Sequence, residues 1–302
     1  HRWHLTGLLG APYETGSVNA SGEPILIDDY IIQPSAECNG DLAEIGVVTH
    51  ETGHLLGLPD LYNTLEQGRT TPVGHWDLMA TGNYNRPASP AHMGAWSRVH
   101  LGWADVTTAD PALFTEETEI TLTSVASSAS VLLLGSDDDS EYVLLEARHR
   151  IGADQHLHAE GILAWYVHPG RVAERMGNNN VNDNLSQPAV AVIPADGRRD
   201  MESDVNDGDA SDPWGHSLGE ILDGQRMASR GAEANFHWRV RGIQPGSAGT
   251  PARLDLTFVA DSVDSGQELT VAPSRIGPWF DGQSVLLPLS VIEEDASDLT
   301  WN

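Results

Sequence analysis

The sequence contains no lysine: all 16 of its Lys and Arg residues are arginine, against 44 Asp and Glu. The formal net charge at pH 7 is −28, which disfavours nucleic acid as a partner, because phosphate repels such a surface. An excess of carboxylates keeps a protein soluble and is used by halophilic proteins. We therefore expect a high-salt or high-GC source organism.

Cysteine and long apolar runs are also scarce. The single cysteine, Cys38, excludes an intramolecular disulfide, and we interpret it as a small buried or half-buried thiol. No window approaches the ~20 consecutive apolar residues of a transmembrane helix, so we expect no transmembrane segment. The 302 residues begin at His1 without an initiator Met, and this length has room for two domains. The oligomeric state stays open.

The strongest pattern that the sequence does contain is a His-Glu-x-x-His motif with a Gly-x-x-Asp extension. His50 and His54 are four residues apart, so on a helix both imidazoles leave the same face and can bind one Zn²⁺. Glu51 stands beside the metal as the general base towards a zinc-activated water. Gly57 can adopt a positive φ and turn the chain. That turn brings Asp60 back as a third ligand and leaves the fourth position to water.

The residues around the motif predict a helix over 41–57. Asp41 is a plausible N-cap, with Glu44 three residues later as its capping-box partner. An apolar series at helical spacing indicates that the helix is buried, and it comprises Leu42, Ile45, Val48, Leu55 and Leu56.

Three segments of the chain resemble the immune inhibitor A family of secreted bacterial and archaeal metallopeptidases. The first is residues 50–63, which contains the motif, and the second is residues 74–82, Gly-His-Trp-Asp-Leu-Met-Ala-Thr-Gly. The third is residues 95–103, Ala-Trp-Ser-Arg-Val-His-Leu-Gly-Trp. The resemblance continues more loosely to about residue 260.

The resemblance implies a secreted, extracellular zinc endopeptidase with a metzincin-like catalytic domain, acting on proteins or peptides. Zinc would be bound by His50, His54 and Asp60, in the metzincin form with Asp in place of a third His. Met79 would be the Met-turn residue beneath the metal. Tyr84, five residues later, is a candidate donor to the oxyanion, with a spacing that departs from the usual one and packing as the alternative.

Other assignments of the site stay open. His75 competes with Asp60 as a ligand, and a carboxylate farther along, such as Glu66, would indicate a zincin-type aminopeptidase. Only about 40 residues precede the predicted helix, whereas the metzincin pattern has a further strand and helix upstream, so we expect that the N-terminal part of the catalytic domain is missing. The first functional alternative is therefore a truncated or inactive family member that binds proteins or cell surfaces.

The predicted fold class is α+β. We expect a partial zinc peptidase catalytic domain over 1–104, a β-rich domain over 105–260, and a linker with the start of an incomplete β module over 261–302. Strands of the β-rich domain are expected near 119–123, 131–134, 142–147, 161–167, 189–193, 235–240 and 252–259. In the first domain, we expect a helix over 88–101 and a substrate-binding edge strand near 25–33.

An acidic run in the second domain predicts a second kind of metal. Asn206, Asp207, Asp209 and Asp212 surround Gly208, and closely spaced oxygen ligands suit Ca²⁺. The resemblance adds support, because family members carry structural calcium, although a solvated acidic loop is the alternative. Weaker candidates for the same ion are Asn182, Asp183 and Asp196.

Overall fold

The structure is a computed structural model, and it describes residues 2–36, 40–66, 70–109, 117–128, 130–217 and 219–258. The interpretation of Cys38 and the module predicted over 261–302 lie outside the described residues.

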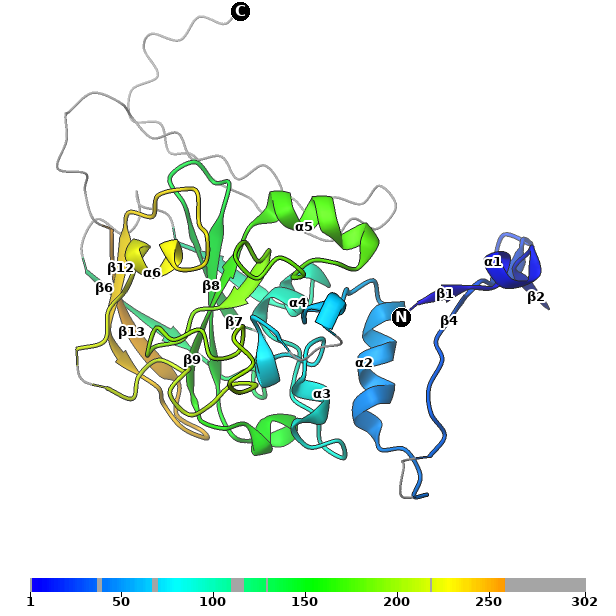
Figure 1. Cartoon of the computed structure of the whole chain (residues 1–302), viewed down its shortest axis with the longest axis horizontal. Helices are drawn as coiled ribbons and strands as arrows, with labels where there is room; N and C mark the ends of the chain where they lie inside the picture. The colour runs from blue at the N-terminus through cyan, green and yellow to red at the C-terminus, as the bar shows by residue number, and fades with distance from the viewer. Residues whose placement is uncertain are drawn as a thin grey trace, which may run out of the picture.

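Two sheets stack in the main body of the molecule (Figure 1). The first has the strand order β10 (Val190–Val192), β9 (Gly161–Val167), β8 (Tyr142–Arg148), β7 (Ser130–Gly135) and β5 (Asp105–Thr108). Its neighbours are antiparallel except β5 and β7, which are parallel. The second, wholly antiparallel sheet has the order β11 (Leu222–Asp223), β12 (Trp238–Gln244), β13 (Ala252–Phe258) and β6 (Thr118–Leu122). The seven strands predicted for this region are confirmed, with ends shifted by a few residues, whereas β5 and the two-residue β11 were not predicted.

The five-stranded sheet is buried on both faces, which explains the continuous apolar runs of its strands. Along β7, Val131 and Leu133 belong to one core and Leu132 and Leu134 to the other. The second core fills the space between the two sheets. The first joins the sheet to residues 58–99 of the motif-bearing region, including Trp76 and Met79. The hydrophobic core is therefore continuous across residue 104, where the sequence predicts the boundary between the first two domains. The predicted domain limits stay predictions.

The helices are short and lie mainly around the five-stranded sheet. The α-helices of the body are α2 (Ile45–Leu55), α3 (Gly82–Asn85), α4 (Ala95–His100), α5 (Pro169–Arg175) and α6 (Gly224–Ala228). The 3-10 turns are η1 (Thr64–Glu66), η2 (Gly74–Trp76), η3 (Gly152–His156) and η4 (Met176–Asn178). Within the described ranges, no helix has the length and apolarity to cross a membrane.

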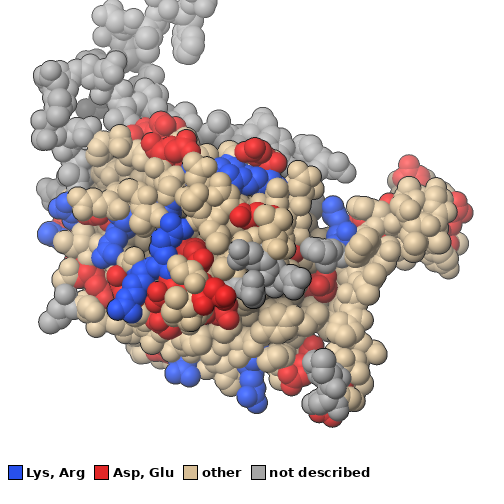
Figure 2. Space-filling view, viewed as in Figure 1, with Lys and Arg blue, Asp and Glu red and all other residues tan. Residues whose placement is uncertain are grey.

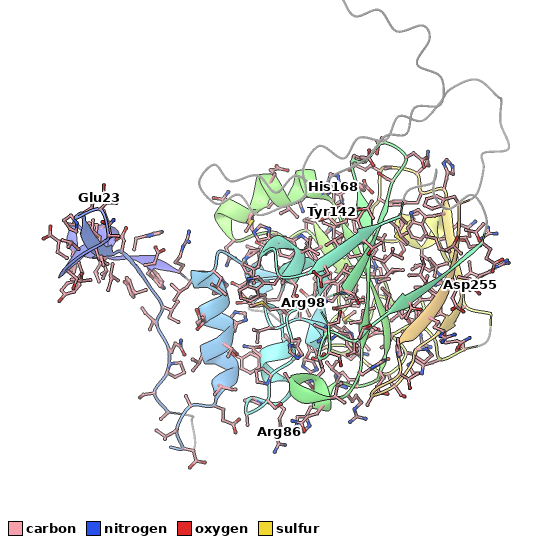
Figure 3. All side chains as sticks on the ribbon, turned by 180° about the vertical axis from the view of Figure 1, so that it is seen from behind. Glu23, Arg86, Arg98, Tyr142, His168 and Asp255 are labelled. Carbon is pink, nitrogen blue, oxygen red and sulfur yellow. The ribbon has the colours of Figure 1, made fainter. Side chains whose placement is uncertain are left out.

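Residues 2–30 form an arm that extends away from the body (Figure 1), with Glu23 near its tip (Figure 3). Here β1 (Trp3–His4) pairs with β4 (Asp29–Tyr30), β2 (Tyr13–Val18) pairs with β3 (Pro24–Ile27), and α1 (Leu5–Leu9) connects the two pairs. Acidic groups lie at the outer edge of the arm and in separate patches on the visible face of the body, where basic groups lie among them (Figure 2). The predicted edge strand overlaps β3 and β4, and its role in binding substrate stays a prediction.

Three local predictions are wrong. The helix over 41–57 begins at Ile45, with Glu44 at the N-cap and no side-chain cap; instead, Gly46 N–H donates to the carbonyl of Pro87 at 2.8 Å. The helix over 88–101 is only α4, because residues 86–94 form turns and extended chain. The predicted apolar series is exposed at Leu42, Ile45 and Val48 and only half-buried at Leu55 and Leu56.

Candidate metal centre

Helix α2 is packed through small and polar residues rather than through its apolar ones. Its buried residues are Gly46, His50, Gly53 and His54, which are spaced as one helical face. A Cβ on Gly46 would lie 2.3 Å from the carbonyl oxygen of Asn83, and one on Gly53 would lie 2.3 Å from Met79 Sδ. The two glycines therefore allow the helix to approach α3 and the turn at Met79, and this approach buries both histidines.

The outer ring nitrogens of both histidines are fixed by backbone carbonyls. His50 Nδ1 lies 2.8 Å from the oxygen of Leu78, and His54 Nδ1 lies 2.8 Å from the oxygen of Leu58. A carbonyl can only accept, so each Nδ1 carries a proton and each Nε2 is the nitrogen available to a metal.

Asp60 completes a group of three converging atoms. Helix α2 ends in a sharp turn in which Gly57 has a φ of 96°. Asp60 Oδ1 then lies 3.0 Å from His50 Nε2 and 3.3 Å from His54 Nε2. Ligands at the usual zinc distances of 2.0–2.1 Å in a tetrahedron are about 3.3 Å apart, so these separations fit a zinc ion.

The second oxygen of Asp60 is bound from a distant part of the chain. Asn179 Nδ2 donates to Asp60 Oδ2 at 2.6 Å, and Asp60 N–H donates to Asn179 Oδ1 at 2.7 Å. The ring of Tyr62 stacks on that of His50 with centroids 6.3 Å apart, and burial, followed by the charge of the nearby Asp60, raises the pKa of the Tyr62 hydroxyl. Sequence reasoning missed both residues. Asn179 lies 119 positions away with no motif around it, whereas the place of Tyr62 directly after the motif was an available signal.

Charge at the centre favours a bound cation. Burial alone would raise the pKa of Asp60, but its hydrogen bonds and charge interactions with His50 and His54 hold that pKa far below the usual value. Burial likewise opposes charge on His50, but the nearby carboxylate outweighs burial and raises the pKa of His50. The buried carboxylate thus attracts positive charge, and a metal ion would take the place of the imidazole proton, because histidine binds a metal in its neutral form.

Glu51 and an open cavity adjoin the three atoms. Glu51 is half-buried, and one of its carboxylate oxygens lies within 4.8 Å of a ring nitrogen of each of His50 and His54. A cavity of about 470 Å³ borders His54, Leu58 and Asn179. The centre therefore has a carboxylate beside the ligands and space for a substrate.

The turn beneath α2 is held rigidly. Met79 is fully buried, and the buried carboxylate of Asp77 accepts hydrogen bonds from Met79 N–H at 2.7 Å, Gly94 N–H at 2.8 Å and Ser97 Oγ at 2.8 Å. This turn fixes the Leu78 carbonyl that orients His50.

A buried charge network lies behind the turn. Arg148 donates to the carbonyl of Trp76 at 2.8 Å and pairs with Glu146 and Asp154, while Arg98 of α4 pairs with Glu146 at 2.5 Å (Figure 3). Removing one partner would leave an uncompensated buried charge, so the network fixes the turn onto the five-stranded sheet.

The rival ligand His75 contacts other residues, and the role of Tyr84 as oxyanion donor stays a prediction. His75 Nδ1 contacts His158 Nε2 at 2.8 Å, and its Nε2 lies 3.9 Å from Asp207. Tyr84, on α3, is 61% exposed. The side chain of Glu66 is outside the described residues.

The acidic loop predicted for calcium forms hydrogen bonds within the protein. Asp212 Oδ2 accepts from Trp76 Nε1 at 3.0 Å and Asp209 N–H at 2.8 Å, while Asp209 accepts from Ser211 and Asn206. Within the described ranges, the group of possible ligands that lie within 4.8 Å of one another is His50, Glu51 and His54, at the candidate metal centre and not in this loop. Calcium at Asn206, Asp207, Asp209 and Asp212 stays a prediction.

Comparisons with known proteins point to the region of the motif. Residues 1–107 match the family model described as immune inhibitor A peptidase M6, catalytic domain. Pre-pro-metalloprotease PrtV from two strains of Vibrio cholerae serotype O1, M66-2 and ATCC 39315 / El Tor Inaba N16961, is 37% identical over 76 residues. This match covers 24% of the chain and 8% of the relatives' length. The resemblance read from the sequence is confirmed, and the comparisons support a metallopeptidase.

Proposed function

Because residues 1–107 carry the match to the immune inhibitor A peptidase catalytic domain, we propose that this protein is a secreted, metzincin-type zinc endopeptidase. Its substrates are extracellular proteins or peptides. The observation that carries the proposal is the convergence of His50 Nε2 and His54 Nε2 on Asp60 Oδ1 at 3.0 and 3.3 Å.

In this proposal, His50, His54 and Asp60 hold the zinc, and each is oriented by a hydrogen bond on its outer side. When bound, zinc polarises the scissile carbonyl and lowers the pKa of a bound water to about 7.

Glu51 carries out the proton transfers. Its carboxylate accepts a proton from the attacking water and delivers it to the leaving amine nitrogen as the peptide bond breaks. Its half-buried position beside His50 and His54 suits this role. Met79 packs beneath α2 as the Met-turn residue.

The test is Glu51→Gln, which keeps the side chain's size but removes the base. We expect casein cleavage to fall by at least ~10²-fold, while bound zinc and the melting temperature stay unchanged. Glu174→Gln is the matched control, since Glu174 is exposed on α5, and we expect it to behave as wild type. Undiminished cleavage by Glu51→Gln would refute the assigned base.

A parallel assay separates the proposal from the alternative of a binding module. Wild-type cleavage of casein that stops with 1,10-phenanthroline and returns with added zinc supports the peptidase. A zinc-loaded wild-type protein that cleaves neither casein nor gelatin would support the inactive family member.

A further inference from the structure

The chain segment that follows η4 is bound to the loop that follows α2. Three side chains of this segment, Asn179, Asn182 and Asp183, contact the loop, and we call them the 179–183 clamp. Asn182 Nδ2 donates to the carbonyl of Leu61 at 2.8 Å. Asp183 Oδ1 accepts from Thr64 N–H at 2.7 Å and from Thr64 Oγ1 at 2.9 Å.

Within the clamp, Asn179 contacts the candidate metal ligand itself. Its amide donates to one carboxylate oxygen of Asp60 and accepts from the backbone N–H of the same residue, at 2.6 and 2.7 Å. These two bonds fix both the position and the rotation of the carboxylate, so Oδ1 faces the two imidazoles. Asp60 is fully buried, and a hydrogen bond to a buried charged group is among the stronger ones in proteins.

The backbone of Asn179 is adapted to this contact. Its φ of 53° and ψ of 36° place it in the left-handed region, and its N–H donates to the carbonyl of Met176 at 3.0 Å. Asparagine is one of the few non-glycine residues that adopt this conformation readily. The preceding helix, α5, is anchored by Arg171, which donates to the carbonyls of Pro188 at 3.1 Å and Gly231 at 2.8 Å.

From this arrangement we propose that Asn179 is a positioning residue for the metal centre, and that the β-rich region thereby sets the metal affinity of the motif-bearing region. The inference rests on the proposed zinc site, but not on peptidase activity. It also gives Asn182 and Asp183 a part in the clamp, which accounts for two of the polar residues that the sequence offered as weak calcium candidates.

The test measures zinc affinity, by competition with a chromophoric chelator at neutral pH, for the full chain. Asn179→Gly removes both hydrogen bonds and tolerates a positive φ without strain. We expect zinc affinity to fall 10–100-fold, as is typical when a group that orients a metal ligand is lost. The rise in melting temperature on adding zinc should shrink accordingly. Asp204→Gly is the matched control, since Asp204 is exposed with a φ of 55°, and it should bind zinc as wild type does.

A second variant, Asn179→Asp, keeps the size and the left-handed preference of the residue, so it tests the proposal should the glycine variant unfold. It places a second carboxylate against Asp60, and we expect a loss of zinc affinity at least as large. Wild-type zinc affinity in either folded variant would overturn the proposal. Weaker zinc binding in these variants, combined with a zinc-loaded wild-type protein that cleaves no casein, would uphold this proposal and refute the peptidase.

Discussion

The candidate metal centre and the acidic loop at residues 206–212 both present carboxylates, but the oxygens are used in opposite ways. At the centre, the outer atoms of the ligands are bound by Leu78, Leu58 and Asn179, and the inner atoms face one another. In the loop, the oxygens of Asp209 and Asp212 accept hydrogen bonds from nearby amides, hydroxyls and an indole. The candidate metal centre thus differs from the acidic loop in which protein groups already donate hydrogen bonds to its carboxylate oxygens.

The pKa shifts of Asp60 and Asp212 also distinguish the candidate metal centre from the acidic loop. Neighbouring imidazoles hold the pKa of Asp60 far below its usual value despite burial. Burial raises the pKa of Asp212 to about 6, only partly offset by its hydrogen bonds from Asp209 and Trp76. Positive charge stabilises the ionised form of the first carboxylate, whereas burial shifts the second towards its protonated form.

The largest expected effect is a loss of zinc binding. It should follow removal of a ligand from the candidate metal centre, but not removal of a carboxylate from the acidic loop. We expect His54→Ala to weaken zinc binding by more than the 10–100-fold typical of groups behind the ligands and to abolish casein cleavage. Asp209→Ala should leave both unchanged. Chelator competition measures zinc affinity, and the casein assay measures cleavage. Loss of zinc from Asp209→Ala would contradict the proposed difference between the two sites.

A glycine substitution tests how closely α2 must pack. A methyl group on Gly53 would meet Met79 Sδ at 2.3 Å, so we expect Gly53→Ala to cost about 1–3 kcal/mol of unfolding free energy and to weaken zinc binding. Gly7→Ala is the matched control, since Gly7 lies in α1 with open space around it. Urea unfolding compares the stability of the two variants. If Gly53→Ala is as stable as Gly7→Ala, the turn at Met79 can move to accommodate the methyl group.

The pH dependence of stability tests the acidic loop. Because the pKa of Asp212 is raised from 3.8 to about 6, the folded state holds a proton that the unfolded state releases, and the free energy of unfolding falls as pH rises through this interval. Asp212→Asn keeps an oxygen for Trp76 but lacks this titration. Between pH 4 and pH 7, the free energy of unfolding of the variant should therefore rise by roughly 1–3 kcal/mol relative to that of wild type. Identical pH profiles in urea unfolding would contradict the assignment.

The smallest expected effect is that of calcium removal. Since Asp209 and Asp212 already accept hydrogen bonds from protein donors, we expect EGTA to shift the melting temperature by less than about 1 °C, which corresponds to a fraction of a kcal/mol. Zinc content must be measured in the same samples, so that loss of zinc is not mistaken for loss of calcium. A drop of several degrees with zinc retained would instead support the calcium predicted from the sequence.

The sequence predicted the parts that depend on local patterns. Apolar runs of β-forming residues predicted β7, β8 and β9, and the spacing of His50, His54, Gly57 and Asp60 predicted a helix, a turn and a return of the chain. The structure has each of these features. Local spacing suffices here because neighbouring residues fix the geometry.

The predictions that failed depend on contacts between distant segments. The predicted cap at Asp41 is replaced by the carbonyl of Pro87, and the buried face of α2 is selected by close approach at Gly46 and Gly53 rather than by apolarity. The partner of Asp60, Asn179, lies 119 residues away. A single sequence gives no sign of that pairing, because nothing local requires an asparagine there.

The most direct test of the central claim is a zinc-loaded crystal measured at the zinc absorption edge. The account predicts one anomalous peak about 2.0–2.2 Å from His50 Nε2, His54 Nε2 and Asp60 Oδ1 together. A peak bound by the histidines with Asp60 turned away, or a peak at another group of residues, would contradict it.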